Sequence, residues 1–261
     1  MAEPEKKGAR ATVRLRVVRQ DAPDKPASRR TEEFEVAVVA NMTVHDCLEA
    51  IRRKPETQAG AKVSPVAWEA PCLEESCGAC AMLINGSARL ACSTTVASVS
   101  PKGQPITLEP LSKLKVERDL IVDKSPMRAA LERVHAWVTL GDMSARAAVP
   151  RESQEQQQRR LELSACIGCG ACLEACPEYQ QGGSFVGAAA INRAHALNQH
   201  ATGAMEKRKR VRSLMQDGGV ADCGKAQACV DVCPKQIPLT ESISKVARDA
   251  TKEMLWGWLA D

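Results

Sequence analysis

The spacing of the cysteines constrains this chain more than any other feature. Eleven of its twelve cysteines fall into three groups. The first reads C-x4-C-x2-C with a fourth cysteine further on, the second reads C-x2-C-x2-C-x3-C-P, and the third repeats the second with Ala226 in place of one cysteine. Such closely spaced thiols suit a shared metal centre better than separate disulfides. The groups are Cys72, Cys77, Cys80 and Cys92; Cys166, Cys169, Cys172 and Cys176; and Cys223, Cys229 and Cys233.

These spacings are typical of iron–sulfur ligation. The first group predicts a [2Fe–2S] cluster on Cys72, Cys77, Cys80 and Cys92. In chains with two C-x2-C-x2-C-x3-C-P runs, the fourth cysteine of each run ligates the cluster of the other run. This rule predicts a [4Fe–4S] cluster on Cys166, Cys169, Cys172 and Cys233.

The third site is one ligand short. It combines Cys176, Cys223 and Cys229 with Ala226 at the missing corner, and a methyl group cannot bind iron. Three thiolates for three irons predict a [3Fe–4S] cluster. A fourth iron with water or a non-cysteine ligand is the alternative at this site.

Zinc is the alternative metal, because a zinc ribbon often explains a single C-x2-C pair. Zinc needs sets of four ligands, and the third set lacks one, with no nearby histidine to supply it. An even number of cysteines leaves disulfides open by count alone, but the short spacings argue against them. A chain with three clusters in series is expected to pass electrons.

Composition limits the class of protein. The 261 residues suit two domains, and 44% hydrophobic with 26% charged residues is normal for a globular chain. A net charge of +4 and 3% aromatic residues argue against a nucleic-acid binder. The N-terminus has no apolar signal region, and no apolar run is long enough for a membrane helix, so a reducing compartment is expected.

The N-terminal part alternates in hydrophobicity as strands do. Residues 12–19 and 33–39 predict strands, and Asn85-Gly86 predicts a hairpin between 81–84 and 87–92. Thr43 opens a predicted helix, with Asp46 completing a capping box. With a last strand at 106–108, the pattern predicts a small α+β domain over residues 1–115.

The C-terminal part, residues 116–261, is predicted to be mainly α-helical. Ser125 is predicted as an N-cap, followed by Pro126 at the first helical position. Further helices are predicted at 152–164, 187–199, 204–216 and 240–254.

Five segments carry a family resemblance: CLEESCGACAMLING from Cys72, RDLIVD, SACIGCGACLEACP, HATGAM and ADCGKAQACVDVCPKQIPL. They resemble the iron–sulfur subunits of succinate dehydrogenase and fumarate reductase. The similarity covers nearly the whole chain and is closer to the branch that works with a dihaem cytochrome b anchor.

The resemblance implies a β-grasp [2Fe–2S] ferredoxin-type domain followed by an α-helical ferredoxin domain. It implies a flavoprotein partner whose covalent FAD oxidises succinate, and electron relay through the [2Fe–2S], [4Fe–4S] and [3Fe–4S] clusters to haem b and quinone in a membrane anchor. Substrate chemistry then belongs to the partner, and no catalytic residue is assigned to this chain. Fumarate reduction is the alternative direction. The expected place is the cytoplasmic face of the cell membrane, held through the anchor.

Several residues stand outside the three groups. Glu178 after Pro177 and Gly224 after Cys223 depart from the mitochondrial pattern, which places the handover at an anchor haem rather than a quinone beside the last cluster. Cys47 is expected to be a buried structural residue. The four histidines are expected to be surface or core residues rather than ligands. The basic run 207–212 is interpreted as a solvated helix face or a contact for anionic headgroups, and Trp256 and Trp258 as packing or membrane-interface residues.

Overall fold

The computed structural model describes residues 11–139 and 152–257. Contacts divide the chain into two compact units, Met1–Asp123 and Lys124–Asp261. The predicted boundary at 115/116 stays a prediction; the division between the units follows the hairpin of β6 (Val116–Arg118) and β7 (Ile121–Val122).

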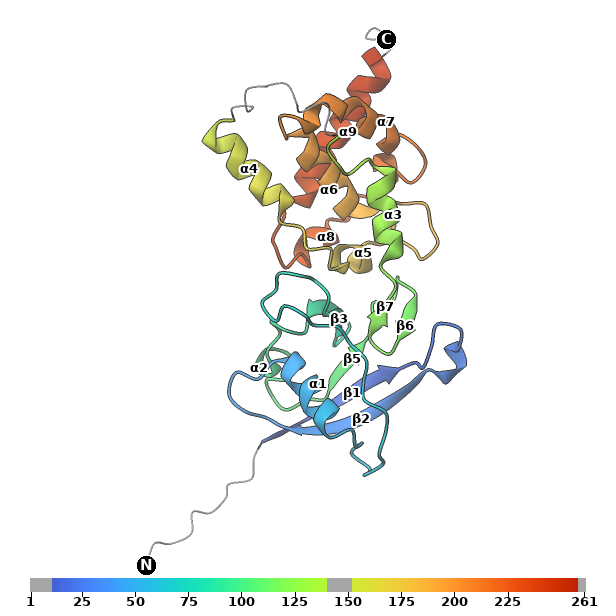
Figure 1. Ribbon diagram of the computed structural model, residues 1–261, viewed down its shortest axis with the longest axis vertical. Helices are drawn as coiled ribbons and strands as arrows, with labels where there is room; N and C mark the ends of the chain where they lie inside the picture. The colour runs from blue at the N-terminus through green and yellow to red at the C-terminus, as the bar shows by residue number, and fades with distance from the viewer. Residues whose placement is uncertain (1–10, 140–151, 258–261) are drawn as a thin grey trace, which may run out of the picture. The chain divides into compact units, whose positions relative to one another are not determined.

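The first unit is built on a five-stranded sheet, in the order β2-β1-β5-β3-β4 (Figure 1). β1 runs parallel to β5, and the other neighbouring strands are antiparallel. This is the predicted β-grasp arrangement, and the α+β class is confirmed. The strands are β1 (Thr12–Arg19), β2 (Arg30–Ala37), β3 (Ala81–Ile84), β4 (Ser87–Leu90) and β5 (Ile106–Glu109).

The sheet follows from alternation along its strands. In β1 the side chains of Val13, Leu15 and Val17 are buried, while the residues between them are exposed. β2 buries Phe34 and Val36 against the same core. β2 begins three residues earlier than predicted and ends two residues earlier. Its pairing with β1 extends from Arg30 to Ala37, and this pairing sets both ends of the strand.

Helix α1 (Val44–Arg53) packs beside β2 and forms as predicted. The Thr43 hydroxyl accepts from the Asp46 amide, and the Asp46 carboxylate accepts from the Thr43 amide, so the capping box is confirmed. Cys47 lies on the buried stripe of this helix, and burial raises the pKa of its thiol to about 12. It is therefore an inert core residue, as predicted.

All the regular elements that the structure describes in the second unit are helices. α6 lies centrally and contacts α3, α4 and α9 (Figure 1). The helices are α3 (Ser125–Arg133), α4 (Gln154–Ser164), α5 (Ala171–Ala175), α6 (Gly187–Asn198), α7 (Lys207–Leu214), α8 (Ala228–Asp231) and α9 (Leu239–Trp256). Short remaining elements are the 3₁₀ turns η1 (Pro26–Ser28), η2 (Gly203–Glu206) and η3 (Val220–Asp222), and helix α2 (Val96–Val99) of the first unit.

The start of α3 differs from the prediction. Ser125 is its first helical residue, Lys124 occupies the cap, and no side chain caps this end. The cap prediction was wrong because Pro126 falls within the first turn whether the helix begins at Ser125 or one residue later, so the proline alone does not fix the start. The helix ends at Arg133.

The residues of the basic run range from buried to exposed, and several pair with acidic residues of α9. Lys207 pairs with Asp249 at 2.8 Å, and Arg208 and Arg212 both bond to Glu253 of α9 at 2.7 Å. Arg210 is fully buried and donates to the carbonyls of His135, Trp137 and Gly203. Lys209 and Arg212 are exposed, so part of the run forms the predicted solvated face, and its contact with anionic headgroups stays a prediction.

Trp256 ends α9 with its side chain largely exposed, whereas Trp258 lies outside the described residues. No described helix has both the length and the apolar character to cross a bilayer.

Candidate cluster sites

The first cysteine group lies on the loop that leads into β3. Cys72, Cys77 and Cys80 come from this loop, and Cys92 follows β4. Asn85 and Gly86, both with positive φ, turn the chain between β3 and β4 and return Cys92 to the loop. The Sγ atoms of Cys80 and Cys92 are 3.4 Å apart, and the Ala79 amide donates to Cys77 Sγ at 3.4 Å. The hairpin thus joins the distant cysteine to the loop, as predicted.

Local surroundings shift the pKa values of two thiols of this group, Cys72 and Cys80, in opposite directions. Hydrogen bonds from the Glu74 amide and from the side chains of Cys77 and Ser76 lower the pKa of Cys72 to about 6. Burial raises the pKa of Cys80 to about 11. The Cys72 thiol therefore loses its proton more readily than the Cys80 thiol, and a bound cation would favour the charged form of Cys80.

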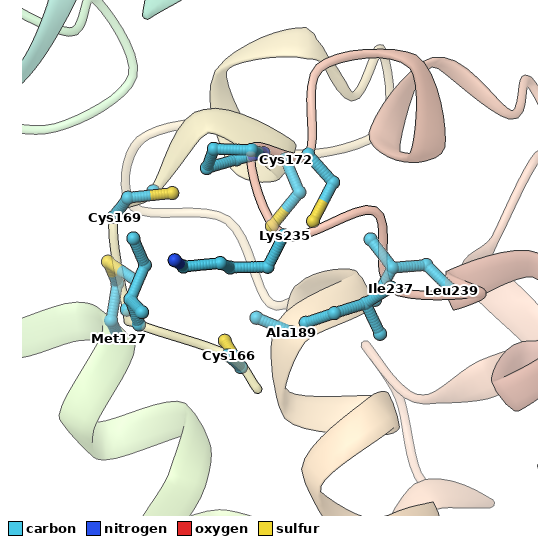
Figure 2. A pocket seen from close by; sticks show the side chains of 13 residues that line it. Met127, Cys166, Cys169, Cys172, Ala189, Lys235, Ile237 and Leu239 are labelled. Atoms are coloured by element: carbon cyan, nitrogen blue, oxygen red, sulfur yellow. The ribbon is translucent and has the colours of Figure 1, made fainter. Parts of the chain in front are cut away.

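The second unit holds two cysteine-lined cavities. Four cysteines line the first, shown in Figure 2: Cys166 and Cys169 from the loop before α5, Cys172 within α5, and Cys233 from the segment after α8. Apolar side chains, among them Met127, Ile237 and Leu239, close its walls. Gly170, at φ +88°, begins α5 in a conformation that favours glycine and directs the loop around the cavity.

Three cysteines line the second cavity: Cys176, Cys223 and Cys229. Ala226 lies on the same wall, where the repeat has lost a cysteine. Lys225 and Gln227, on either side of it, both have positive φ, so this segment keeps the tight curvature of a ligand loop without its second sulfur. α5 and α8 pack together between the two sets.

Burial dominates the electrostatics of these thiols. It raises the pKa of Cys169, Cys172 and Cys229, most strongly at Cys172, and neighbouring cysteines raise the pKa of all three further. Mutually repelling, buried thiolates need a cationic centre to stay charged. The donor set therefore fits iron, which supplies that charge.

All twelve cysteines are free of disulfides. Among the described residues, no three His, Cys, Asp or Glu side chains converge as they would on one metal ion. The sulfurs surround cavities instead, which suits a multi-atom centre.

Sequence reasoning missed the charged residues of these cavities as parts of a site, Lys225 of the three-cysteine cavity included. Lys235 lines the four-cysteine cavity, and Glu178 lines the three-cysteine cavity. For Lys235 and Glu178 the signal is positional, because each follows directly after a Cys-Pro pair. No histidine lines either described cavity, and His195 is buried with Nδ1 3.1 Å from the Ser242 hydroxyl.

Two family models match the chain. Residues 14–129 match a 2Fe-2S iron-sulfur cluster binding domain, and residues 162–237 match a 4Fe-4S dicluster domain. Both matches cover the cysteine groups described above.

Curated relatives extend over nearly the full length. The succinate dehydrogenase iron-sulfur subunit of Bacillus subtilis (strain 168) is 42% identical over 91% of this chain and 92% of its own length. The fumarate reductase iron-sulfur subunits of Wolinella succinogenes and Escherichia coli O6:H1 are 29% and 26% identical, covering 90% and 93% of this chain and 95% of each relative.

A solved structure shares the fold. A chain of the Mycobacterium smegmatis Sdh1 complex in the apo form matches with a TM-score of 0.77 at 22% identity, covering 94% of this chain and 98% of that chain. Taken with the sequence matches, the chain belongs to the family of iron–sulfur subunits of succinate dehydrogenase and fumarate reductase, and it is an electron-transfer subunit of that oxidoreductase family.

Proposed function

We propose that the three cysteine sets hold three clusters of two, four and three irons. The proposed ligands are Cys72, Cys77, Cys80 and Cys92 for [2Fe–2S]; Cys166, Cys169, Cys172 and Cys233 for [4Fe–4S]; and Cys176, Cys223 and Cys229 for [3Fe–4S]. The observation that carries this proposal is the crossing in the second unit, since each cavity takes its last cysteine from the other run.

Bound clusters supply one-electron chemistry, and the chain supplies their surroundings. Thiolates hold the iron, apolar walls such as Met127 and Leu239 limit water, and nearby charges set the energy of the added electron. No side chain of this subunit needs to move a proton or bind succinate.

In this proposal the chain relays electrons from the FAD of a flavoprotein subunit to a membrane anchor carrying haem b, and quinone is reduced there. The relatives are named as subunits, which supports the proposal that this chain is part of a larger complex. We further propose that the chain belongs to the branch with a dihaem cytochrome b anchor and that it lies on the cytoplasmic face of the membrane. Glu178 and Gly224 support haem as the acceptor, because neither offers the aromatic or histidine contacts expected for quinone.

Fumarate reductase is the second candidate. Relatives named for both reactions match this chain along its length. The ligand sets serve either direction, and the B. subtilis relative, at 42% identity, favours succinate oxidation.

The crossing gives the sharpest test. Cys176→Ser should remove the three-iron EPR signal and spare the four-iron signal, and Cys233→Ser should do the reverse. Cys47→Ser is the matched control and should change neither. If Cys176→Ser abolished the four-iron signal instead, each run would hold its own cluster and the ligand sets would be wrong.

Purification of the wild-type complex tests the proposed partners and the identity of the metal. Purification in mild detergent should yield brown protein with iron, a flavoprotein and a haem-bearing companion. Colourless protein with stoichiometric zinc would favour the alternative from another class, in which the chain is a zinc-binding interaction module that carries no electrons.

A further inference from the structure

Two residues at equivalent places of an internal repeat, Lys235 and Glu178, bring opposite charges to the two cavities of the second unit. Lys235 follows Cys233 and Pro234, and Glu178 follows Cys176 and Pro177. Because each run gives its last cysteine to the other run's cavity, Lys235 lines the four-cysteine cavity and Glu178 lines the three-cysteine cavity.

Lys235 brings a cation to an otherwise uncharged wall. Figure 2 shows its side chain extending into the cavity between Cys166 and Cys169. Apart from the cysteines, the other residues that line this cavity are apolar or glycine. No ion pair or hydrogen bond holds its ammonium in the described structure, and the residue is half-buried. Its charge is therefore directed at the thiolates and at whatever they bind.

Glu178 brings an anion to the other cavity. A Cβ on Gly224 would clash with Glu178 Oε1, so the absence of a side chain at Gly224 makes room for the carboxylate. Gly224 is the neighbour of Cys223, which places the carboxylate at the ligand loop. Lys225 also lines this cavity, and both charged residues are exposed to solvent.

A fixed charge near a redox centre shifts its potential in a known direction. Reduction adds one negative charge, so a nearby cation favours the reduced form and a nearby anion opposes it. The effect is greater where water is excluded and smaller where solvent and salt screen the charges.

We propose that Lys235 and Glu178 tune the two clusters in opposite directions: Lys235 raises the potential of the four-iron cluster, and Glu178 lowers that of the three-iron cluster. The two residues together therefore change the difference in reduction potential between the two clusters, although neither residue binds iron. This proposal rests on the ligand sets proposed above.

The test is a redox titration followed by EPR on the assembled complex. Lys235→Gln should reduce the equilibrium constant for reducing the four-iron cluster about tenfold, which is 59 mV for one electron. Its three-iron potential should stay unchanged. Glu178→Gln should raise the same constant of the three-iron cluster about threefold, because that site is more exposed, and should spare the four-iron cluster.

Three further variants separate charge from structure. Lys235→Arg keeps the charge and should keep the wild-type potential. Lys235→Met removes the charge but keeps an unbranched apolar side chain. If Lys235→Gln assembles poorly, the potential of the four-iron cluster in Lys235→Met tests the proposal instead. Lys245→Gln removes an exposed cation of α9 that lines neither cavity and should shift neither cluster.

Unchanged potentials in the neutral variants would overturn the proposal, as would equal shifts of both clusters in one variant. The failure of the ligand sets looks different: the wild-type complex would then lack the four-iron or three-iron signal before any charge is changed. Raising the ionic strength should reduce the Glu178 effect more than the Lys235 effect.

Discussion

At the scale of single residues, the most constrained charge in the first unit is Arg19. Its side chain is 1% exposed and pairs with Asp119, also 1% exposed, at 2.9 Å between Nε and Oδ1. It pairs with Glu32 as well and donates to Ser64 and to the carbonyl of Pro65. Asp119 in turn accepts from the amides of Gln20 and Ala67. This cluster fixes residues 64–67, from which the chain runs on to Cys72.

Removing Arg19 should therefore be costly. Arg19→Met leaves the Asp119 carboxylate buried without its cation and is expected to lower the free energy of unfolding by about 3–5 kcal/mol. Arg16, on the same strand, pairs with Glu33 in solvent, with side chains 49% and 41% exposed, and is the matched control. Arg16→Met should cost less than about 1 kcal/mol. Urea unfolding followed by circular dichroism measures both, and equal losses would contradict the role given to burial.

At the scale of elements, a buried polar chain joins three helices of the second unit. Asn192 on α6 donates to the carbonyl of Leu163 on α4 at 2.7 Å, and Ser242 on α9 donates to Asn192 at 2.8 Å. The hydroxyl of Ser242 is then left to accept from Nδ1 of His195, 3.1 Å away. This assigns the neutral Nδ1–H tautomer, with Gln199 beside Nε2. Leu163 lies three residues before Cys166, so the chain also anchors the start of a ligand loop.

The polar chain makes stability depend on pH. Burial lowers the pKa of His195; Glu241 and Asp249 raise it, and Arg159 and Lys245 lower it. Because the unfolded chain takes up this proton near its ordinary pKa of about 6.5 and the folded chain resists it, stability falls as the pH drops below about 6.5.

Thermal unfolding at pH 7.5, 6.5 and 5.5 should show this loss. His195→Gln keeps a polar side chain but cannot take up the proton, so the slope of stability against pH should become shallower. His200→Gln serves as the control and should keep the wild-type slope, since that residue is only partly buried and lies outside the polar chain. An unchanged slope in His195→Gln would contradict the assignment of this proton.

At the scale of the whole molecule, the two units draw on different sources of order. The first unit has a sheet with a continuous apolar core, in which Leu15, Val17, Ile106 and Leu108 are fully buried. In the second unit, α5 and α8 have five and four residues. Helices this short are not stable alone and depend on the groups that hold their ends.

Removal of iron should therefore affect the units unequally. After anaerobic chelation of the clusters, amides of α5 and α8 should lose protection from hydrogen exchange, while those of β1 should keep it. Hydrogen-exchange mass spectrometry measures this, with the iron-loaded protein as reference. Equal loss of protection in β1 would show that the sheet, too, depends on the metal.

Much of the fold and of the site could be predicted from sequence where the cause is local. The capping box at Thr43 and the turn at Asn85-Gly86 depend on neighbouring residues, and both form as expected. The start of α3 could not be fixed, because a proline in the first turn is compatible with more than one start. The pairing of Arg208 and Arg212 with Glu253 was equally out of reach, since it joins residues more than forty positions apart.

The sequence by itself determined the kind of chemistry, because cysteine spacing within a loop limits which centre the thiols can surround. Tertiary structure alone decided what else faces those centres. In the sequence, Lys235 and Glu178 are each a charged residue after a Cys-Pro pair. Only the fold, which packs the two runs together, places them in the walls of the cavities. The reason is physical: ligation depends on covalent spacing along the chain, whereas an electrostatic effect depends on distance through space.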